Sequence, residues 1–381
     1  MKVFITAGEA SGDKLGAAFM RGMRTLRPEA EFRGIGGPLM LAEGLESLFP
    51  MDEISIMGIV EILREYRALK ARIRQTAQAI LDWTPDVVVT IDLPEFSLRV
   101  NKRVKAARPS QRVVHYVAPT VWAWRPGRAA KMVGVVDQVL ALLPFEPPYM
   151  ERVGIDCDFV GHPVVLEDVA SKEDALAWRR SEGLEGRKLA LILPGSRRSE
   201  VTRLLPVFRD VTERLAVRRP DLAFVLPAAP GVAERVRAEV AGWSAPVHVI
   251  DPLDEDAVAA KRAAFRAADV ALAASGTVSL ELAANGTPMV IAYDMGWLSR
   301  QIIGRLLLVD TVTLVNLVSE TRAIPEFIGK DCEPEAIASG VLRVLDGPGA
   351  QREAMDLTMQ RLGREGEEPG LRAARAVLAR L

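Results

Sequence analysis

Short apolar runs alternate with longer amphipathic segments along nearly the whole chain. The runs have the length and composition of buried parallel strands, and the segments between them carry apolar residues at helical spacing. The predicted strands are residues 2–7, 31–35, 86–91, 112–117, 139–143, 189–193, 222–226, 247–250, 270–274 and 289–292. This alternation predicts an α/β protein with two halves and a crevice between them.

The same pattern suggests where the domains begin and end. A chain of 381 residues suits two domains. We expect an N-terminal domain over residues 1–165 and a second domain over residues 166–350. Helical patterns continue around residues 298–308 and over residues 351–381. For this last segment, a return to the N-terminal domain and an exchange with a partner subunit both remain open.

A turn of small residues, Ser275-Gly276-Thr277, joins the strand at 270–274 to a predicted helix. The free N–H groups and the dipole at a helix start make a site for an anion. Glu281 lies one helical turn beyond Thr277, where its carboxylate could accept hydrogen bonds from a ribose. The alternative interpretation is an ordinary strand-to-helix corner without a ligand.

A second corner of the same kind follows the strand at 189–193. There, Gly195-Ser196-Arg197 leads into a helix that begins near Val201. The guanidinium of Arg197 is a rigid fork suited to phosphate oxygens. Two such corners in one half of the chain predict a nucleoside diphosphate held between them.

Asp92 directly follows the strongly apolar strand at 86–91. A carboxylate at the carboxyl end of a central strand points into the crevice of an α/β sheet, so Asp92 is a candidate general base. It is equally well placed to cap a following helix, which Pro94 favours at this point. The sequence alone leaves both roles open.

Two loops of the first half carry further candidates. Gly8 to Asp13 follows the first strand and matches neither the dinucleotide fingerprint nor a Walker loop. In the loop after residue 117, Trp122 and Trp124 are interleaved with Arg125. We expect these tryptophans to line a groove for a sugar or an acyl chain.

The segment 56–73 predicts a basic amphipathic helix. Its apolar stripe is formed by Ile59, Val60, Leu63, Tyr66 and Leu69, and Arg and Lys residues flank it. Helices of this composition can lie in a membrane interface. The other interpretation is a helix whose apolar face packs on the sheet.

The overall charge is nearly balanced, with a formal net charge of −1, which argues against general binding to nucleic acid. The distribution is uneven, because residues 96–136 contain no Asp or Glu but nine Arg and Lys residues. Part of this basic stretch is a solvated helix face. The rest predicts an anionic partner, either a phosphate or an anionic membrane surface.

Residues suited to metal binding are sparse. Cys157 and Cys332 lie far apart, and the three His residues are scattered. We therefore expect neither a metal site nor a disulfide framework, which fits a reducing cytoplasm. No run reaches the ~18 apolar residues of a transmembrane helix, and the N-terminus has the pattern of a strand rather than a signal peptide.

Blocks of sequence in order along nearly the whole chain resemble the lipid-A-disaccharide synthase family. They are Gly8-Glu9-Ala10-Ser11-Gly12-Asp13, Met57-Gly58-Ile59-Val60-Glu61, Ile91-Asp92-x-Pro94-x-Phe96, His115-Tyr116-Val117-x-Pro119-x-Val121-Trp122-Ala123-Trp124-Arg125, Leu143-Pro144-Phe145-Glu146, Gly161-His162, Leu193-Pro194-Gly195-Ser196-Arg197, Ala274-Ser275-Gly276-Thr277, Glu281 and Asn316. The first and fourth blocks are specific, whereas glycine-serine turns alone are not. Glu95 stands where the family usually has Asp, so the role of this second carboxylate is open.

The resemblance implies an inverting, metal-independent glycosyltransferase of the GT-B type, with two Rossmann-like domains and no cofactor. Its donor would be UDP-2,3-diacylglucosamine and its acceptor 2,3-diacylglucosamine 1-phosphate (lipid X). The products would be the β-1′,6-linked tetraacyl disaccharide 1-phosphate and UDP. The N-terminal domain would face the acceptor and the membrane, and the second domain would bind the UDP donor. A peripheral place on the cytoplasmic side of the inner membrane is implied as well, and a homodimer is left open.

Residue roles follow from the matched motifs. Asp92 would take the proton from the acceptor 6-hydroxyl, and Arg197 would meet the charge on the leaving UDP. The predicted UDP-binding residues are Gly195, Ser196, Arg197, Ser275, Gly276, Thr277, Glu281 and Asn316. The predicted acceptor residues are Glu9, Ser11, Trp122, Trp124 and Arg125. The apolar stripe of residues 59–69 would meet the membrane.

Two alternatives keep parts of this pattern. A UDP-N-acetylglucosamine 2-epimerase has the same two-domain scaffold and similar nucleotide corners, but needs neither a membrane helix nor a Trp-rich acceptor loop. A lipid-binding protein without enzymatic activity would need the amphipathic helix but not the corner that carries Arg197. Activity with UDP-diacylglucosamine, with and without lipid X, separates the three.

Overall fold

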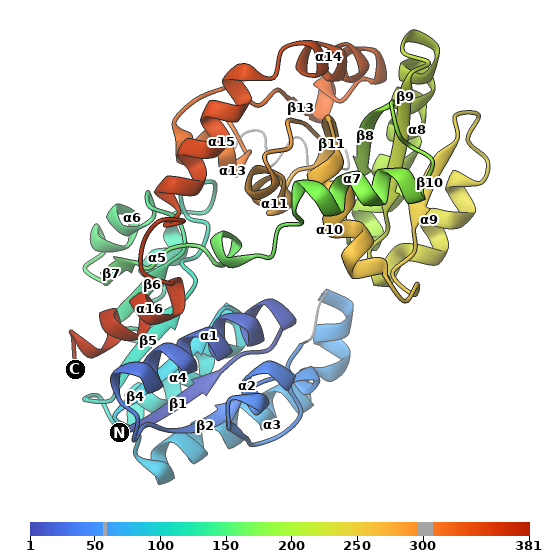
Figure 1. Ribbon diagram of the computed structural model, residues 1–381. Helices are drawn as coiled ribbons and strands as arrows, with labels where there is room; N and C mark the ends of the chain where they lie inside the picture. Colours follow the sequence, from blue (N-terminus) through green and yellow to red (C-terminus); the bar gives the residue numbers. More distant parts are fainter. Residues whose placement is uncertain (56–58, 296–307) are drawn as a thin grey trace. The chain divides into compact units, whose positions relative to one another are not determined.

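The computed structural model describes residues 1–55, 59–295 and 308–381, and of residues 59–66 it describes the backbone only. The described chain divides into two compact units, each with its own sheet (Figure 1). Residues 1–163 and 365–381 form the first unit, and residues 164–364 form the second. The helix predicted around 298–308 lies almost wholly outside the described residues.

The first unit is built on a parallel sheet with strand order β3-β2-β1-β4-β5-β6-β7. Its strands are β1 (Lys2–Thr6), β2 (Glu31–Ile35), β3 (Glu46–Ser47), β4 (Val87–Ile91), β5 (Arg112–Tyr116), β6 (Gln138–Ala141) and β7 (Asp156–Phe159). Its helices are α1 (Ala10–Leu26), α2 (Pro38–Ala42), α3 (Ile59–Trp83), α4 (Pro94–Ala107), α5 (Gly127–Ala130), α6 (Pro147–Glu151) and α16 (Pro369–Leu378). The strand order reverses between β1 and β4, and loops at such a switch point are the usual place for a ligand.

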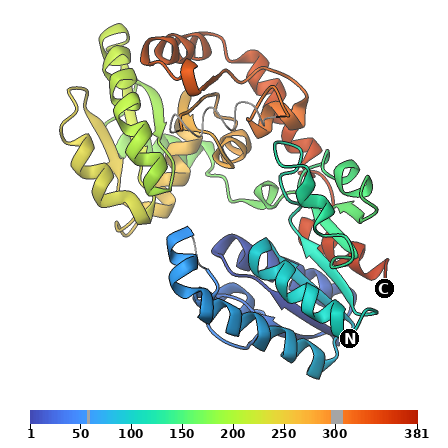
Figure 2. The ribbon, with the colours of Figure 1, turned by 180° about the vertical axis from the view of Figure 1, so that it is seen from behind.

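Helices cover both faces of this sheet, which explains why its central strands are continuous apolar runs. Phe4, Val88 and Val113 pack with α3 and α4 in one cluster, and Val3 and Val89 pack with α1 and α16 in another. Figure 2 shows α3 and α4, in blue and teal, on the face of the sheet opposite α1. Because successive side chains of a strand point to opposite faces of the sheet, each apolar strand contributes to both of these clusters.

The last helix, α16, joins the first unit by close contact with α1. A Cβ atom added to Gly22 would lie 2.5 Å from the carbonyl oxygen of Gly370. A Cβ on Gly370 would meet the Ala18 carbonyl oxygen at 2.4 Å. Since real Cβ atoms do not approach so closely, both glycines are needed for this helix pair.

The second unit has a parallel sheet with strand order β10-β9-β8-β11-β12-β13. Its strands are β8 (Lys188–Leu193), β9 (Leu222–Pro227), β10 (Val247–Ile250), β11 (Val270–Ala274), β12 (Met289–Tyr293) and β13 (Glu326–Ile328). Its helices include α7 (Lys172–Ser181), α8 (Arg198–Arg218), α9 (Ala233–Val240), α10 (Ala257–Ala267), α11 (Val278–Asn285), α13 (Leu314–Ser319), α14 (Pro334–Asp346) and α15 (Gly349–Arg361). Here the order reverses between β8 and β11, which pair directly.

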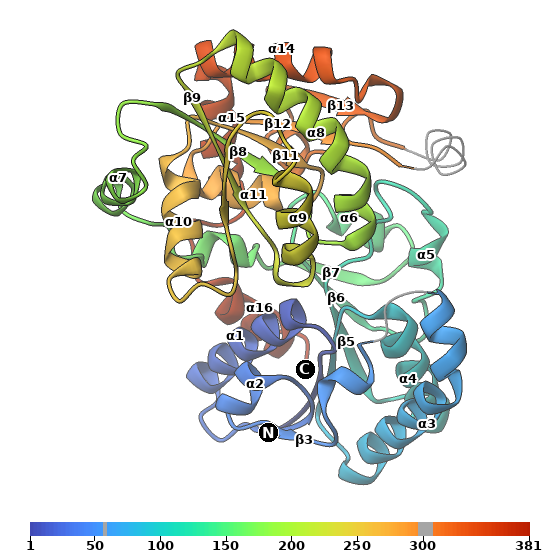
Figure 3. The ribbon, with the colours of Figure 1, turned by 90° about the vertical axis from the view of Figure 1, so that its right-hand side faces the viewer.

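Three helices, α8, α9 and α14, pack against one face of the second sheet, while α7 and α10 lie on the other side (Figure 3). Leu204, Phe208, Val211 and Leu215 of α8 are fully buried at helical spacing. Truncating one of them to Ala would destabilise the unit by about 2–5 kcal/mol.

Each predicted strand is present, with ends that differ by at most two residues. The short strands β3, β7 and β13 are not predicted by the hydrophobic pattern. They lie at sheet edges and are only partly buried, so they lack a continuous apolar run.

The amphipathic helix is longer than predicted, and one of its stripe residues is in the core. Leu69 is 5% exposed. Together with Ile73 and Ile80 of the same helix, it belongs to the core cluster between α3 and the sheet, so its predicted contact with a membrane is wrong. The physical reason is that α3 continues to Trp83, and this part of the helix covers the sheet. The side chains of Ile59, Val60, Leu63 and Tyr66 lie outside the described residues. No described helix is both long and apolar enough to cross a bilayer.

Candidate functional site

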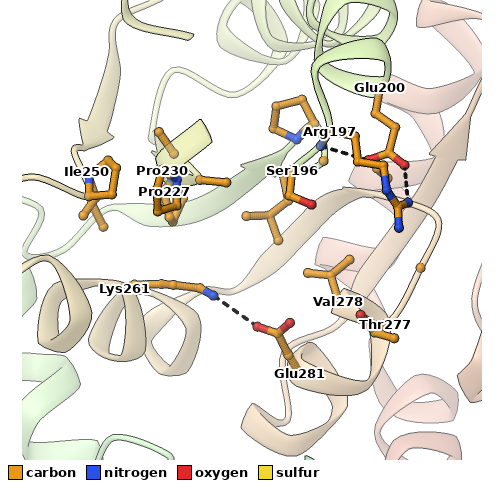
Figure 4. Close-up of a pocket in the computed structure, with 18 of the residues that line it drawn as sticks. Ser196, Arg197, Glu200, Pro227, Pro230, Ile250, Lys261, Thr277, Val278 and Glu281 are labelled. Carbon is orange, nitrogen blue, oxygen red and sulfur yellow. Dashed lines mark hydrogen bonds and ion pairs between the residues drawn. The ribbon is translucent and has the colours of Figure 1, made fainter. Parts of the chain in front are cut away.

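A pocket of about 560 Å³ opens in the second unit where the two predicted corners meet (Figure 4). The corners meet because β8 and β11 are adjacent parallel strands, whose carboxyl ends lie at the same edge. Of the predicted UDP-binding residues, Gly195, Ser196, Arg197, Ser275, Gly276, Thr277 and Glu281 line the pocket. Residues far apart in sequence thus form one site.

The first corner leaves β8 through Gly195, whose φ of +105° is disfavoured for residues with a side chain. A Cβ atom there would also lie 2.7 Å from Oε2 of Glu200. Arg197 is extended and stands immediately before α8, and its guanidinium pairs with Glu200 at 3.0 Å. Its side chain is 70% exposed, so the guanidinium can turn toward a ligand at the helix start.

The second corner leaves β11 at Ser275 and enters α11 after Thr277. Gly276 has a φ of +153°, and a Cβ atom added to it would meet nothing within 4 Å. The backbone of this turn is therefore open to the space beside it. The N–H groups of Ser279, Leu280 and Glu281 already donate to carbonyl oxygens of Gly276 and Thr277. The N–H groups placed to meet an anion are therefore those of the turn that precedes them.

Side chains absent from the prediction complete the pocket. Lys261, from α10, pairs with Oε2 of Glu281 at 3.2 Å. An apolar wall is formed by Pro227, Ala228, Ala229, Pro230, Ile250 and Pro252, which follow or end strands β9 and β10. Because these residues end or follow two predicted parallel strands, the sequence could have placed them at the edge of the sheet where the pocket lies. Nothing in the local sequence of α10 distinguished Lys261.

The charged side chains of the pocket cancel in pairs. Arg197 pairs with Glu200 and Lys261 pairs with Glu281, and these four are the charged residues among the described residues that line the pocket. A bound diphosphate therefore needs further positive potential. The dipoles of α8 and α11 and the N–H groups of the turns before them would supply it.

Asn316 lies in α13 and is not among the pocket residues. Its side chain is fully buried, and its Nδ2 donates to Oγ1 of Thr311 at 3.1 Å and to the carbonyl oxygen of Ile324 at 2.9 Å. Its Oδ1 accepts the N–H of Ile324. In this structure, the amide holds the segment around α13 together and is not presented to a ligand.

Asp92 follows β4 in a left-handed backbone conformation, with a φ of 48°, and Leu93 has a φ of 47°. Such residues cost about 1–3 kcal/mol each and cluster at functional sites. Burial raises the pKa of the Asp92 carboxyl above its ordinary value, while the Leu93 N–H and the charge of Arg128 partly oppose this shift. The residue that stands immediately before α4 is Leu93, so Asp92 does not occupy the predicted N-cap position.

The loop after β1 and the first turn of α1 carry both buried and exposed polar residues. The buried Asp13 carboxylate accepts the N–H groups of Gly37, Leu39 and Met40, and thereby fixes the loop that follows β2. Glu9 is half-buried immediately before α1, and Ser11 is exposed. Both lie beside the carboxyl end of β1, near the switch point of the sheet.

The Trp-rich loop differs from the prediction at one position. Trp122 is 6% exposed, and its Nε1 donates to Oε1 of Glu146 at 3.3 Å, so it cannot line a groove for substrate. Its ring packs edge-on against Phe145 instead. Trp124 is half-buried, and the guanidinium of Arg125 lies 4.2 Å from the centre of its ring. These two residues remain candidates for contact with a substrate.

Among the described residues, no group of three or more His, Cys, Asp and Glu side chains is arranged to hold a metal ion. Cys157 and Cys332 are both buried, and neither is joined in a disulfide.

The fold defines the class of protein first. It resembles UDP-N-acetylglucosamine 2-epimerase from Neisseria meningitidis bound to UDP-GlcNAc, with a TM-score of 0.64, 14% identity and coverage of 100% of this chain and 99% of that one. A putative UDP-N-acetylglucosamine 2-epimerase from Listeria monocytogenes gives a TM-score of 0.63 at 15% identity, over 99% and 95% of the two chains. At this identity the likeness establishes the fold alone. The predicted α/β fold of the GT-B type is confirmed.

Sequence similarity gives the family. The lipid-A-disaccharide synthetase family matches residues 3–379, and the chain belongs to this family. The lipid-A-disaccharide synthase of Ruegeria pomeroyi is 58% identical over 100% of this chain and 96% of its own length. That of Rhodospirillum centenum is 47% identical over 99% and 94%. The predicted resemblance is confirmed, and with it the assignment to the glycosyltransferases of lipid A biosynthesis.

Proposed function

We propose that this protein joins UDP-2,3-diacylglucosamine to 2,3-diacylglucosamine 1-phosphate, releasing UDP and the β-1′,6-linked tetraacyl disaccharide 1-phosphate. The observation that carries the proposal is the convergence of the Gly195–Arg197 and Ser275–Thr277 corners on one pocket. The family of the chain agrees with it, since relatives with 58% and 47% identity are named lipid-A-disaccharide synthase. Structures that share only the fold do not favour an epimerase over this reaction.

The donor pocket supplies what a metal-independent transfer requires. The diphosphate lies between the two helix starts, where Arg197 and main-chain N–H groups meet its charge. The ribose lies beside Glu281, and the uracil lies against the apolar wall that includes Pro227 and Ile250. As the bond between the anomeric carbon and the UDP oxygen breaks, negative charge grows on the diphosphate. The same groups then stabilise it more strongly.

On the acceptor side, Asp92 takes the proton from the 6-hydroxyl as that oxygen attacks the anomeric carbon of the donor. Its raised pKa makes the carboxylate a stronger base, which favours proton transfer near neutral pH. Attack from the face opposite the leaving group inverts the anomeric configuration. Glu9, Ser11, Trp124 and Arg125 are proposed to orient the acceptor.

Both substrates carry acyl chains, so the protein must reach them at a membrane surface. The first turns of α3, with Ile59, Val60, Leu63 and Tyr66, are proposed to enter the interface on the cytoplasmic side of the inner membrane. The basic stretch at 96–136 would add attraction to anionic lipids. A homodimer remains compatible with this arrangement.

The proposal is tested by incubating the purified protein with the UDP donor, with and without lipid X, in buffer that contains EDTA. Disaccharide 1-phosphate and UDP are expected in equal amounts, and only when both substrates are present. The Asp92→Asn variant is the matched control, because it should retain UDP binding but form product far more slowly than the unchanged protein. Release of UDP or formation of a C2 epimer from the donor alone would contradict the proposal, and so would a requirement for added magnesium.

A further inference from the structure

The ion pair between Lys261 and Glu281 joins α10 to α11 inside the donor pocket. Figure 4 shows this pair and the Arg197–Glu200 pair in separate parts of the pocket. The Lys261 ammonium also lies 5.1 Å from the centre of the Phe265 ring, and the Phe265 side chain is buried. A carboxylate on one side and an aromatic face on the other therefore hold this ammonium in place.

The two helices are tied together without this pair. Arg266 of α10 donates through Nη1 to the carbonyl oxygen of Asn285, at the end of α11, at 2.6 Å. Oγ1 of Thr287, just beyond α11, donates to the carbonyl oxygen of Phe265 at 2.6 Å. These buried or half-buried contacts lie at the far end of α11, whereas Lys261 acts at the end that meets the pocket. An exposed pair adds little to stability by itself.

The geometry indicates what the pair does for a ligand. Lys261 donates to Oε2 of Glu281, and no hydrogen bond from another described residue uses Oε1, so this oxygen can accept one from a ligand. Two neighbouring ribose hydroxyls are best accepted by a carboxylate with a fixed orientation, because an exposed Glu side chain otherwise loses rotamer freedom on binding. Glu281 keeps 29% of its side-chain surface exposed, so its carboxylate remains accessible from the pocket.

We infer that Lys261 is a positioning residue, which fixes the Glu281 carboxylate toward the ribose and so makes the pocket selective for nucleotides with both ribose hydroxyls. The inference rests on the proposed binding of a UDP donor and adds a residue that acts through Glu281. Lys261 need not touch the nucleotide. Its removal weakens only that part of the binding which depends on the hydroxyls.

The test measures the affinities of UDP and 2′,3′-dideoxy-UDP by calorimetry for the full chain and for Lys261→Met, which keeps most of the length of the side chain and removes its charge. The unchanged protein should bind UDP at least ~10-fold more tightly than the dideoxy nucleotide, in line with about 1.4 kcal/mol. In Lys261→Met, UDP affinity should fall by ~10-fold while dideoxy-UDP affinity stays the same. Lys261→Arg should restore most of the difference.

Arg262→Met is the matched control, since this neighbour on α10 pairs with Asp168 at 3.1 Å and does not line the pocket. Both affinities should be unchanged in that variant. Adding Lys261→Met to Glu281→Gln should have no further effect on UDP affinity, because the partner that Lys261 orients has lost its charge. In donor kinetics, Lys261→Met should raise KM and leave kcat nearly unchanged.

Three outcomes would overturn the inference. Equal weakening of UDP and dideoxy-UDP would mean that Lys261 contacts the phosphates directly. A selectivity unchanged in Lys261→Met would mean that Glu281 is oriented without it. A fall in the melting temperature of the ligand-free protein, with selectivity intact, would assign the pair to stability. If the unchanged protein binds no UDP at all, the proposed donor site fails together with this inference, and that result is distinct from the other three.

Discussion

The two units have the same kind of sheet and place different chemistry at the same point of it. Each sheet is parallel, and its order reverses once, between β1 and β4 in the first unit and between β8 and β11 in the second. In the second unit, both switch-point loops are glycine turns that open helices and line one pocket. In the first unit, the corresponding segments carry carboxylates. Asp13, in the first turn of α1, accepts main-chain N–H groups of the loop after β2, whereas Asp92 directly follows β4 and has a raised pKa.

Under the proposed function, this difference lets one topology serve two substrates. A diphosphate is met by backbone N–H groups, so its loops need glycine and close approach of the main chain. An acceptor hydroxyl needs a base, so its loop needs a carboxylate in a partly dry environment. Topology places the ligands, and loop composition decides which chemistry is done there.

Removing the base should have the largest effect. Asp92→Asn keeps the shape of the side chain but removes its basicity, so kcat should fall by ~10²–10⁴. UDP affinity should not change, because the donor pocket belongs to the second unit. Steady-state kinetics and UDP calorimetry on one preparation check this. If UDP binding were lost together with activity, Asp92 would not act only as a base, and the assignment of base and donor pocket to separate units would be wrong.

Removing the exposed guanidinium of the donor pocket comes next. Arg197→Ala should lower kcat by ~10²–10³, since charge on the leaving diphosphate would lose its partner in the transition state. UDP binding should weaken as well, in contrast to Asp92→Asn. Arg198→Ala is the matched control, because this neighbour is exposed and does not line the pocket. A near-normal kcat in Arg197→Ala would leave the helix starts as the main source of stabilisation.

Two leucines of α3 test the surface of the first unit. Leu69→Ala should cost about 2–5 kcal/mol, because the side chain is buried with Ile73 and Ile80. Leu63→Ala should leave the melting temperature nearly unchanged and reduce flotation with anionic liposomes, most clearly at high salt. Thermal melts and flotation of both variants give the comparison. A large loss of stability in Leu63→Ala with normal flotation would place this residue in the core.

The pH dependence of stability should show a smaller contrast. In the first unit, burial raises the pKa of Glu146 to about 7 and lowers the pKa of His115 and of His162 to about 4. In the second, Asp269 is only partly buried, and hydrogen bonds with Lys188 and Arg179 lower its pKa despite that burial. In the first unit, burial thus shifts the pKa of these three side chains in the direction that favours their neutral forms.

The sign follows from proton uptake. Between pH 4.5 and 7, the folded protein holds more protons on Glu146 than the unfolded chain does, so this residue lowers stability as pH rises. The two histidines act in the opposite direction between pH 4 and 6.5. Glu146→Gln removes only the first contribution. Its stability relative to the unchanged protein should therefore rise from pH 4.5 to 7 and then stay level. Melting curves across this range would contradict the assignment if the difference were flat.

Much of this architecture was predictable because the signals are local. Apolar runs mark buried parallel strands whatever surrounds them, and a glycine turn between a strand and a helix marks the Gly195 and Gly276 corners. Asp92 was also identifiable, since it directly follows a strongly apolar strand. For these features, the residues themselves impose the backbone geometry.

Only the tertiary structure decided whether a given side chain packs in the core or stays accessible to a ligand. A tryptophan in a polar loop is compatible with a substrate groove or with the core, and the buried Glu146 carboxylate settles Trp122 in the core. Leu69 has the same helical spacing as its neighbours on the stripe, but the sheet beneath α3 covers it. Asn316 and Lys261 depend on partners from other segments, Ile324 and Glu281, that no local pattern identifies. The sequence by itself determines where strands end and which polar or charged side chains stand at those ends. Only packing determines which of these side chains remain accessible to a ligand.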